Sequence, residues 1–285
     1  MESYLLDICS REQGLLLQNK TFFPLNGPLL SISNSSHKKI ISFVHAAWDK
    51  SSSKIVAGDS FGNIYMFYLQ KNKFILLYHW HNACCTFLTF SPDRRQDVIV
   101  ALSDCSVVSL NSDSKTIENQ FNHHISCITY ISFDKSGQKV LSCSKDQAIL
   151  WNLSTFQILR YLTLKKSIDI VKVFFHPSED IIILAFKDSS VFLWNSENFI
   201  CTSRFICTSE DVPLNIKCID ISSNGKLLAC AGKANWFIIW STEENKKLYT
   251  ILLPSNVVMV KQIYFLTCLQ GLTEGYVSKC DSFIA

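Results

Sequence analysis

One stretch of the chain holds residue types that could form a hydrolytic site: His124, Ser142, Asp146 and Trp151. In a hydrolase, histidine takes the proton of a nucleophilic serine and aspartate orients the imidazole. The chain has no G-x-S-x-G elbow, however, and here the aspartate falls in an expected turn and the tryptophan ends an expected strand. The spacing therefore favours a structural network over a catalytic one, with Ser144 as the alternative to Ser142.

Metal and redox chemistry are not supported either. His123-His124 and His79-x-His81 have no second Cys/His pair at a matching spacing, so no metal site is predicted. The 12 cysteines include no C-x-x-C pair, and several lie inside apolar runs, where cysteine behaves as a small buried hydrophobe. We predict no cofactor.

The elements that carry these residues repeat along the chain. Five segments share one layout: an apolar strand, a polar turn, a second strand, an Asp- or Gly-bearing turn, and a third strand that ends on a large apolar residue. The ends of the third strands lie 43, 41, 43 and 46 residues apart, at Phe67, Leu110, Trp151, Trp194 and Trp240. A repeat of this length predicts an all-β, WD-type β-propeller with five recognisable blades.

The turns agree with this layout. The turn before the third strand carries Asp59, Asp104, Asp146 or Asp188, a residue type that favours turn conformations. The middle strands are continuous apolar runs such as 181–186, as expected for strands buried on both faces.

A sixth unit begins at residues 260–265, and no turn aspartate, second apolar strand or terminal tryptophan follows it. We therefore expect an N-terminal extension over 1–27, a propeller over 28–266 and an atypical tail over 267–285. Either the ring closes or it stays incomplete. Residues 28–34 or a strand-donating partner could complete its last blade, because an open sheet edge invites pairing.

Composition narrows the function. Apolar residues make up 48% of the chain and charged residues 18%, which excludes a mainly disordered protein. The net charge of +3 is too small to suggest nucleic-acid binding. There is no signal peptide and no 18-residue apolar run that could span a membrane, so a reduced, cytoplasmic setting is expected.

Four segments resemble the amino-terminal WD-repeat region of TBC domain family member 31; they cover residues 57–65, 172–177, 186–192 and 229–235. In WD-repeat proteins, positions like those of His124, Ser142, Asp146 and Trp151 form a network that links the turn aspartate to the indole N–H. The resemblance implies an adaptor of centriolar satellites, the centrosome and cilium biogenesis. Family members continue into a TBC domain, which nothing here matches, so a truncated, non-functional fragment is a further reading.

Three functions follow as hypotheses. The first is a non-enzymatic scaffold that binds other proteins. The second is a propeller with a ligand-binding or catalytic site in its central channel, for which the innermost strands offer only Lys172 and Asp220. The third is the fragment. The absence of a catalytic motif favours the scaffold, with partners unidentified.

Overall fold

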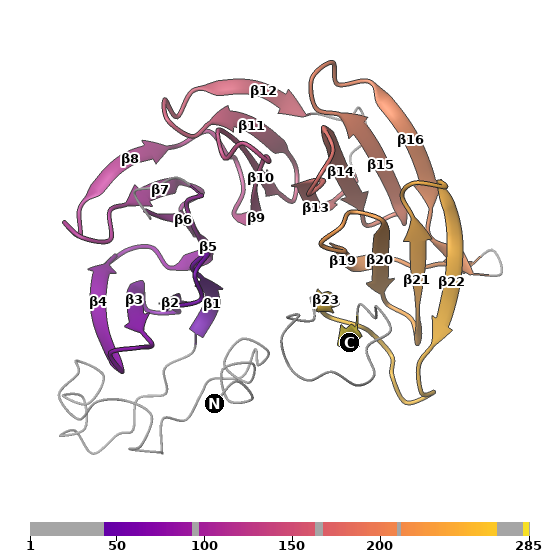
Figure 1. The fold of residues 1–285 in the computed structure, drawn as a ribbon, viewed down its shortest axis with the longest axis horizontal. Helices are drawn as coiled ribbons and strands as arrows, with labels where there is room; N and C mark the ends of the chain where they lie inside the picture. Colours follow the sequence, from indigo (N-terminus) through magenta and orange to yellow (C-terminus); the bar gives the residue numbers. More distant parts are fainter. Residues whose placement is uncertain (1–42, 93–96, 163–167, 210–211, 267–281, 285) are drawn as a thin grey trace, which may run out of the picture. The chain divides into compact units, whose positions relative to one another are not determined.

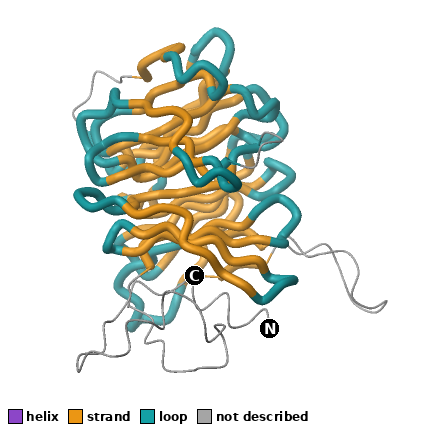
Figure 2. Tube along the Cα trace, turned by 90° about the vertical axis from the view of Figure 1, so that its left-hand side faces the viewer, coloured by secondary structure: helices purple, strands orange, loops and turns teal. Residues whose placement is uncertain are grey.

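The computed structural model describes residues 43–92, 97–162, 168–209, 212–266 and 282–284, and this part contains strands and no helix (Figure 2). The predicted extension 1–27 and the candidate closing strand 28–34 lie outside the described residues. The described strands form five antiparallel sheets of four strands each, which we call blades 1 to 5 (Figure 1).

The blades follow one another along the chain. Blade 1 contains β1 (Phe43–Trp48), β2 (Lys54–Asp59), β3 (Asn63–Tyr68) and β4 (Lys73–His79). Blade 2 contains β5 (Cys85–Phe90), β6 (Val98–Leu102), β7 (Val107–Leu110) and β8 (Ile117–Phe121). Blade 3 contains β9 (Ile128–Phe133), β10 (Lys139–Ser144), β11 (Ala148–Asn152) and β12 (Ile158–Leu162). Blade 4 contains β13 (Ile170–Phe175), β14 (Ile181–Phe186), β15 (Ser190–Asn195) and β16 (Cys201–Ile206). Blade 5 contains β19 (Ile216–Ile221), β20 (Leu227–Gly232), β21 (Trp236–Ser241) and β22 (Lys246–Leu252).

Two small sheets complete the described fold. The hairpin of β17 (Thr208–Ser209) and β18 (Val212–Pro213) connects blades 4 and 5 in the chain. The strand β23 (Tyr264–Leu266) starts the sixth unit and pairs with β24 (Ser282–Ile284). The sequence predicted no second apolar strand after the start of the sixth unit, and β24, with three residues, is too short to show an apolar run.

The WD-type β-propeller class with five blades and the start of a sixth is confirmed. All five predicted third strands lie within β3, β7, β11, β15 and β21. The middle strands are buried on both faces, and every residue of β6 is buried. This explains why these runs show no polar alternation, whereas the outer strand β8 exposes four of its five residues.

The turn before the third strand often needs a left-handed residue. In blades 1, 2 and 4 the last turn residue is Gly62, Cys105 or Ser189, with φ of 84°, 70° and 74°. A type I turn followed by a left-handed residue is a common three-residue hairpin loop. The turn of blade 3, residues 145–147, contains no residue with positive φ.

The chain divides into two compact units. The first contains blades 1 and 2, the second contains blades 4 and 5, and blade 3 contributes residues to both. In the first unit one core cluster joins blades 1 and 2 and includes Val56, Met66, Leu88 and Val100. In the second unit Phe237 and Ile239 of β21 belong to a cluster that Val260 and Ile263 extend towards β23.

Candidate functional site

Two of the residues that suggested a hydrolase, Ser142 and Trp151, lie in the buried interior of blade 3. The indole Nε1 of Trp151, on β11, donates a hydrogen bond of 3.0 Å to the hydroxyl of Ser142, on β10. Both side chains are completely buried. Ser144, the alternative, donates to the carbonyl oxygen of Gln147 at 3.2 Å instead. A hydroxyl enclosed in this way cannot meet a substrate, so Ser142 acts as the acceptor for a buried indole.

The other two members occupy flanking segments. Asp146 lies in the turn between β10 and β11, as predicted from the sequence. His124 lies in the segment that leads to β9 and is buried beside the ring of Phe121, at 6.2 Å between centroids. Burial, and to a smaller extent the neighbouring His123, lowers the pKa of His124 to about 4. The imidazole is therefore neutral at physiological pH.

The remaining turn aspartates cap backbone groups. Asp104 and Asp188 each accept the N–H of the residue two positions later, Ser106 or Ser190, at 3.0 Å. Asp59 is instead the last residue of β2, and its carboxylate accepts the N–H groups of Phe61 and Asn63 at 2.9 Å. All three carboxylates hold the turn that precedes a third strand, and the bonds described for them are local ones.

The blade-ending residues are packed unequally. Leu110 is fully buried, and Phe67 stacks on Phe74 at 5.8 Å between ring centroids. Trp194 and Trp240 are partly buried, and in the described structure their Nε1 atoms are buried without a hydrogen-bond acceptor. Trp240 gains a parallel stack on Phe205, at 4.0 Å.

The residue near the end of each second strand explains why the Nε1 atom of Trp151 has a hydrogen-bond acceptor and those of Trp194 and Trp240 have none in the described part of the chain. Ser142 stands two residues before the end of β10, at Ser144. The same position in β14 and β20 is occupied by Leu184 and Cys230, neither of which offers the indole a hydroxyl. At this core position, blade 3 has a serine that accepts the indole N–H, and blades 4 and 5 have a leucine and a cysteine.

Lys172 and Asp220, the two channel candidates, lie close together and connect neighbouring blades. Lys172 Nζ, on β13, lies 3.7 Å from a carboxylate oxygen of Asp220, on β19, and donates to the carbonyl oxygen of Ile219 at 3.1 Å. The other carboxylate oxygen of Asp220 accepts the N–H of Phe265, on β23, at 2.9 Å. These contacts connect the first strands of blades 4 and 5 to each other and to β23.

A similar side-chain hydrogen bond connects the first strands of blades 3 and 4. Ser132, the fifth residue of β9, accepts the N–H of Phe175 on β13 at 3.1 Å. Asp220 is likewise the fifth residue of β19. In both cases the first strand of a blade offers a side-chain acceptor to the next first strand, from β9 to β13 and from β19 to β23, so β23 is held as a sixth blade's first strand would be.

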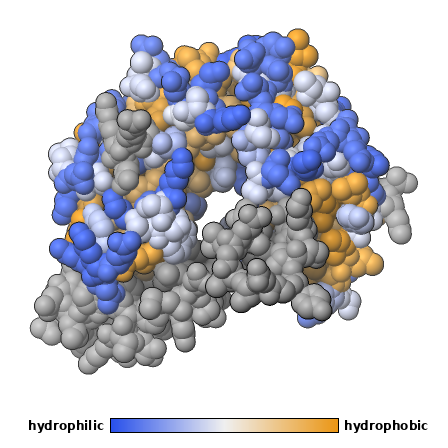
Figure 3. Space-filling view, in the orientation of Figure 1, coloured by the Kyte–Doolittle hydropathy of each residue, from blue (hydrophilic) through white to orange (hydrophobic). Residues whose placement is uncertain are grey.

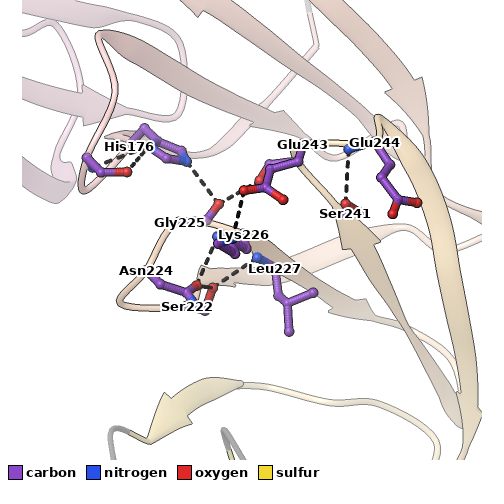
Figure 4. A network of polar contacts seen from close by, with 11 residues as sticks. His176, Ser222, Asn224, Gly225, Lys226, Leu227, Ser241, Glu243 and Glu244 are labelled. Carbon is purple, nitrogen blue, oxygen red and sulfur yellow. Dashed lines mark hydrogen bonds and ion pairs between the residues drawn. The ribbon is translucent and has the colours of Figure 1, made fainter. Parts of the chain in front are cut away.

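A second connection between blades centres on His176 (Figure 4). Its Nδ1 accepts the N–H of Glu179 at 3.0 Å, so the proton lies on Nε2, which donates to the carbonyl oxygen of Gly225 at 2.9 Å. The same carbonyl oxygen accepts the hydroxyl of Thr242 at 2.6 Å. This network fastens the β13–β14 loop of blade 4 to the β19–β20 turn of blade 5.

Blade 5 exposes large apolar side chains on its outer strand and in the segment that follows it. Tyr249 and Leu252 on β22 are 63% and 75% exposed, and Val258 in the following segment is 81% exposed. Figure 3 shows apolar surface where Figure 1 draws the lower part of β22. We call Tyr249, Leu252 and Val258 the blade 5 strip. In sequence it differs from β8, whose exposed residues include Glu118, Asn119 and Gln120.

Comparison with known proteins agrees with the blade pattern. The family described as WD domain, G-beta repeat matches residues 115–152, which span β8 to β11. Curated proteins named TBC1 domain family member 31 match almost the whole chain: the Xenopus tropicalis protein is 34% identical over 91% of this chain, and the human protein is 33% identical over 91%.

This chain resembles the WD-repeat part of TBC1 domain family member 31. The resemblance that the turn sequences predicted is therefore confirmed. The chain spans about a quarter of the length of these relatives, with 24% of the frog protein and 25% of the human protein covered. A Dictyostelium discoideum protein named retinoblastoma-binding-like protein E is 33% identical over 37% of this chain.

Neither a metal centre nor a spanning helix is found in the described part of the chain. Its residues include no group of three or more His, Cys, Asp or Glu side chains that could hold a metal ion. They also form no helix long and apolar enough to cross a membrane.

Proposed function

We propose that this chain is a non-enzymatic scaffold that binds other proteins. One observation carries the proposal: the side chains with catalytic potential take part in structural bonds, while apolar side chains remain exposed on blade 5. Ser142 accepts an indole N–H and Asp220 accepts a strand N–H. Tyr249 and Leu252 are exposed on an outer strand, where an apolar surface invites a protein partner.

The likeness to TBC1 domain family member 31 supports a more specific role. We propose that the chain acts in the cytoplasm, at centriolar satellites and the centrosome, and contributes to cilium biogenesis. The partners are proteins rather than nucleic acid, because the net charge of +3 gives no strong basic surface.

Microscopy of the full chain, tagged in ciliating cells, tests this role. We expect granules around the centrosome that overlap a centriolar-satellite marker, and fewer ciliated cells when the protein is depleted. A diffuse signal with unchanged ciliation would contradict the role at satellites and leave only the general scaffold.

A further inference from the structure

Two cysteines in the first unit lie on segments that face each other. Cys105 ends the β6–β7 turn of blade 2, and Cys127 immediately precedes β9. The thiol of Cys105 donates to the carbonyl oxygen of Ile125 at 3.7 Å, and the thiol of Cys127 donates to that of Ser103 at 3.3 Å. Each sulfur thus reaches the backbone two residues before the other cysteine, so the two side chains cross.

The equivalent pair in blades 4 and 5 supports this proximity. Ser189 has the left-handed turn position of Cys105, and Asn215 immediately precedes β19 as Cys127 precedes β9. In that pair the N–H of Asn215 donates to the Ser189 hydroxyl at 3.0 Å. The fold therefore brings the side chain at the turn position against the residue that enters the next blade.

The two thiols are also accessible, unlike the buried thiols of Cys85, Cys143 and Cys230. Cys127 is exposed and Cys105 is half-buried. Burial, followed by the adjacent Cys127 thiol, raises the pKa of the Cys105 thiol. Cys127 is thus the more available thiol for an oxidant and Cys105 is the neighbour that can react with its product.

We propose that Cys105 and Cys127 form a reversible disulfide when the protein meets a hydroperoxide. The Cys127 thiol first loses its proton to the solvent. The thiolate then attacks one peroxide oxygen, the O–O bond breaks, and a sulfenic acid forms while hydroxide leaves (an alkoxide for an organic peroxide) and takes up that proton to become water (or an alcohol). The Cys105 sulfur then attacks the sulfenic sulfur, expelling hydroxide, which takes the Cys105 proton to leave as a second water. Two thiols are oxidised, one peroxide is reduced, and a cellular thiol such as glutathione reverses the bond by exchange.

The cross-link would join the β6–β7 turn to the start of β9. It would oppose separation of these two segments, so oxidation would stiffen the first unit. This inference does not depend on the scaffold role, since it needs only the two thiols and a peroxide.

Peptide mapping of the full chain tests it directly. Trypsin cleaves after Lys115, so peptides 96–115 and 116–135 each carry one of the two cysteines. After treatment with about one equivalent of hydrogen peroxide and alkylation, we expect these peptides to be joined and a reducing agent to separate them. The joined species should be lost in C105S and C127S and retained in C201S, a control at an exposed cysteine on β16.

A second readout separates the chemistry from any folding defect. In C105S the Cys127 sulfenic acid has no partner, so its capture by dimedone should rise at least tenfold over the wild-type chain, with unchanged circular dichroism. The proposal is overturned if Cys127 pairs with another cysteine, if both thiols remain alkylatable after peroxide, or if dimedone labels Cys127 equally in both proteins.

Discussion

The polar residues of this chain stabilise the blades, and Ser142 shows this most clearly. Its hydroxyl is the buried acceptor for the Trp151 indole, at 3.0 Å. A buried donor left without an acceptor costs about 1–3 kcal/mol, more than a satisfied hydrogen bond contributes. The residue types of a hydrolase therefore reflect the need to satisfy an indole inside a sheet.

Replacing Ser142 with Ala should lower the free energy of unfolding by about 1–3 kcal/mol, because Trp151 Nε1 loses its acceptor. Chemical denaturation followed by tryptophan fluorescence measures this change. The matched variant is Cys230→Ser, which places a hydroxyl at the equivalent position below Trp240, whose indole has none. Cys230→Ser should lower the free energy of unfolding by less than Ser142→Ala does. Equal losses of stability in the two variants would refute the role assigned to the Ser142 hydroxyl.

His124 makes the fold sensitive to acid. Its pKa is about 4 in the fold and 6.5 for an ordinary histidine, so the unfolded chain binds the proton more readily between these values. The stability is complete above pH 6.5 and falls as the pH drops towards 4, by about 3 kcal/mol at most. Burial also lowers the pKa of His45 to about 4, so this residue adds to the slope.

Unfolding temperatures measured from pH 7 to pH 4 check the His124 prediction. His124→Gln should flatten the decline, whereas His81→Gln, at an exposed site, should leave it unchanged. A profile of His124→Gln that superimposes on that of the wild-type chain would show that this histidine does not titrate on unfolding.

At the scale of elements, adjacent blades are connected by side chains at equivalent strand positions. Ser132 holds β13 and Asp220 holds β23, each from the fifth position of a first strand. The tie at β23 is the stronger type of bond, because its acceptor is a charged carboxylate. Asp220 therefore positions the start of the sixth unit.

Asp220→Ala should release β23. We expect the amide of Phe265 to exchange with deuterium at least tenfold faster, because it loses its carboxylate acceptor. The matched variant Ser132→Ala should accelerate Phe175 and leave Phe265 unchanged. Hydrogen exchange with mass spectrometry at peptide resolution gives the answer, and unchanged protection of Phe265 would show that Asp220 does not hold the strand.

Gly225 allows the His176 connection to form. It has φ of 77°, and a Cβ at this position would lie 2.2 Å from His176 Cε1 (Figure 4). Gly225→Ala should therefore reduce stability by more than the roughly 1 kcal/mol expected from the left-handed backbone alone. In a double-mutant cycle, His176→Ala should absorb part of this penalty by removing the clash. Strictly additive losses would contradict the contact.

The blades could be predicted from the sequence, and the contacts between them could not. Third strands that end one residue after Trp151, Trp194 and Trp240 follow from a period that local burial imposes on every repeat. The roles of His176 and Asp220 depend on which residue of the next blade faces them, 49 and 45 residues away in the chain. A single sequence has no signal for such a distant pairing, and the short strand β24 was missed for the same reason.

At the scale of the whole molecule, repetition gives one chain several similar sheets and leaves function to the surfaces that differ. Blade 5 carries the apolar strip of Tyr249, Leu252 and Val258, while the outer strand of blade 2 is polar. The chain covers about a quarter of the length of TBC1 domain family member 31. Activities that belong to the other three quarters of those proteins are therefore not assigned to this chain.

Proximity labelling in ciliating cells tests the scaffold claim most directly. The full chain fused to a labelling enzyme is compared with Tyr249→Ser/Leu252→Ser and with Leu159→Ser, a control on the outer strand β12 that is 50% exposed. We predict a defined set of proteins labelled by the wild-type chain and the control, and reduced at least fivefold by the double variant. A wild-type set no different from that of the free labelling enzyme would contradict the scaffold claim, and equal labelling by all three chains would contradict the role of the blade 5 strip.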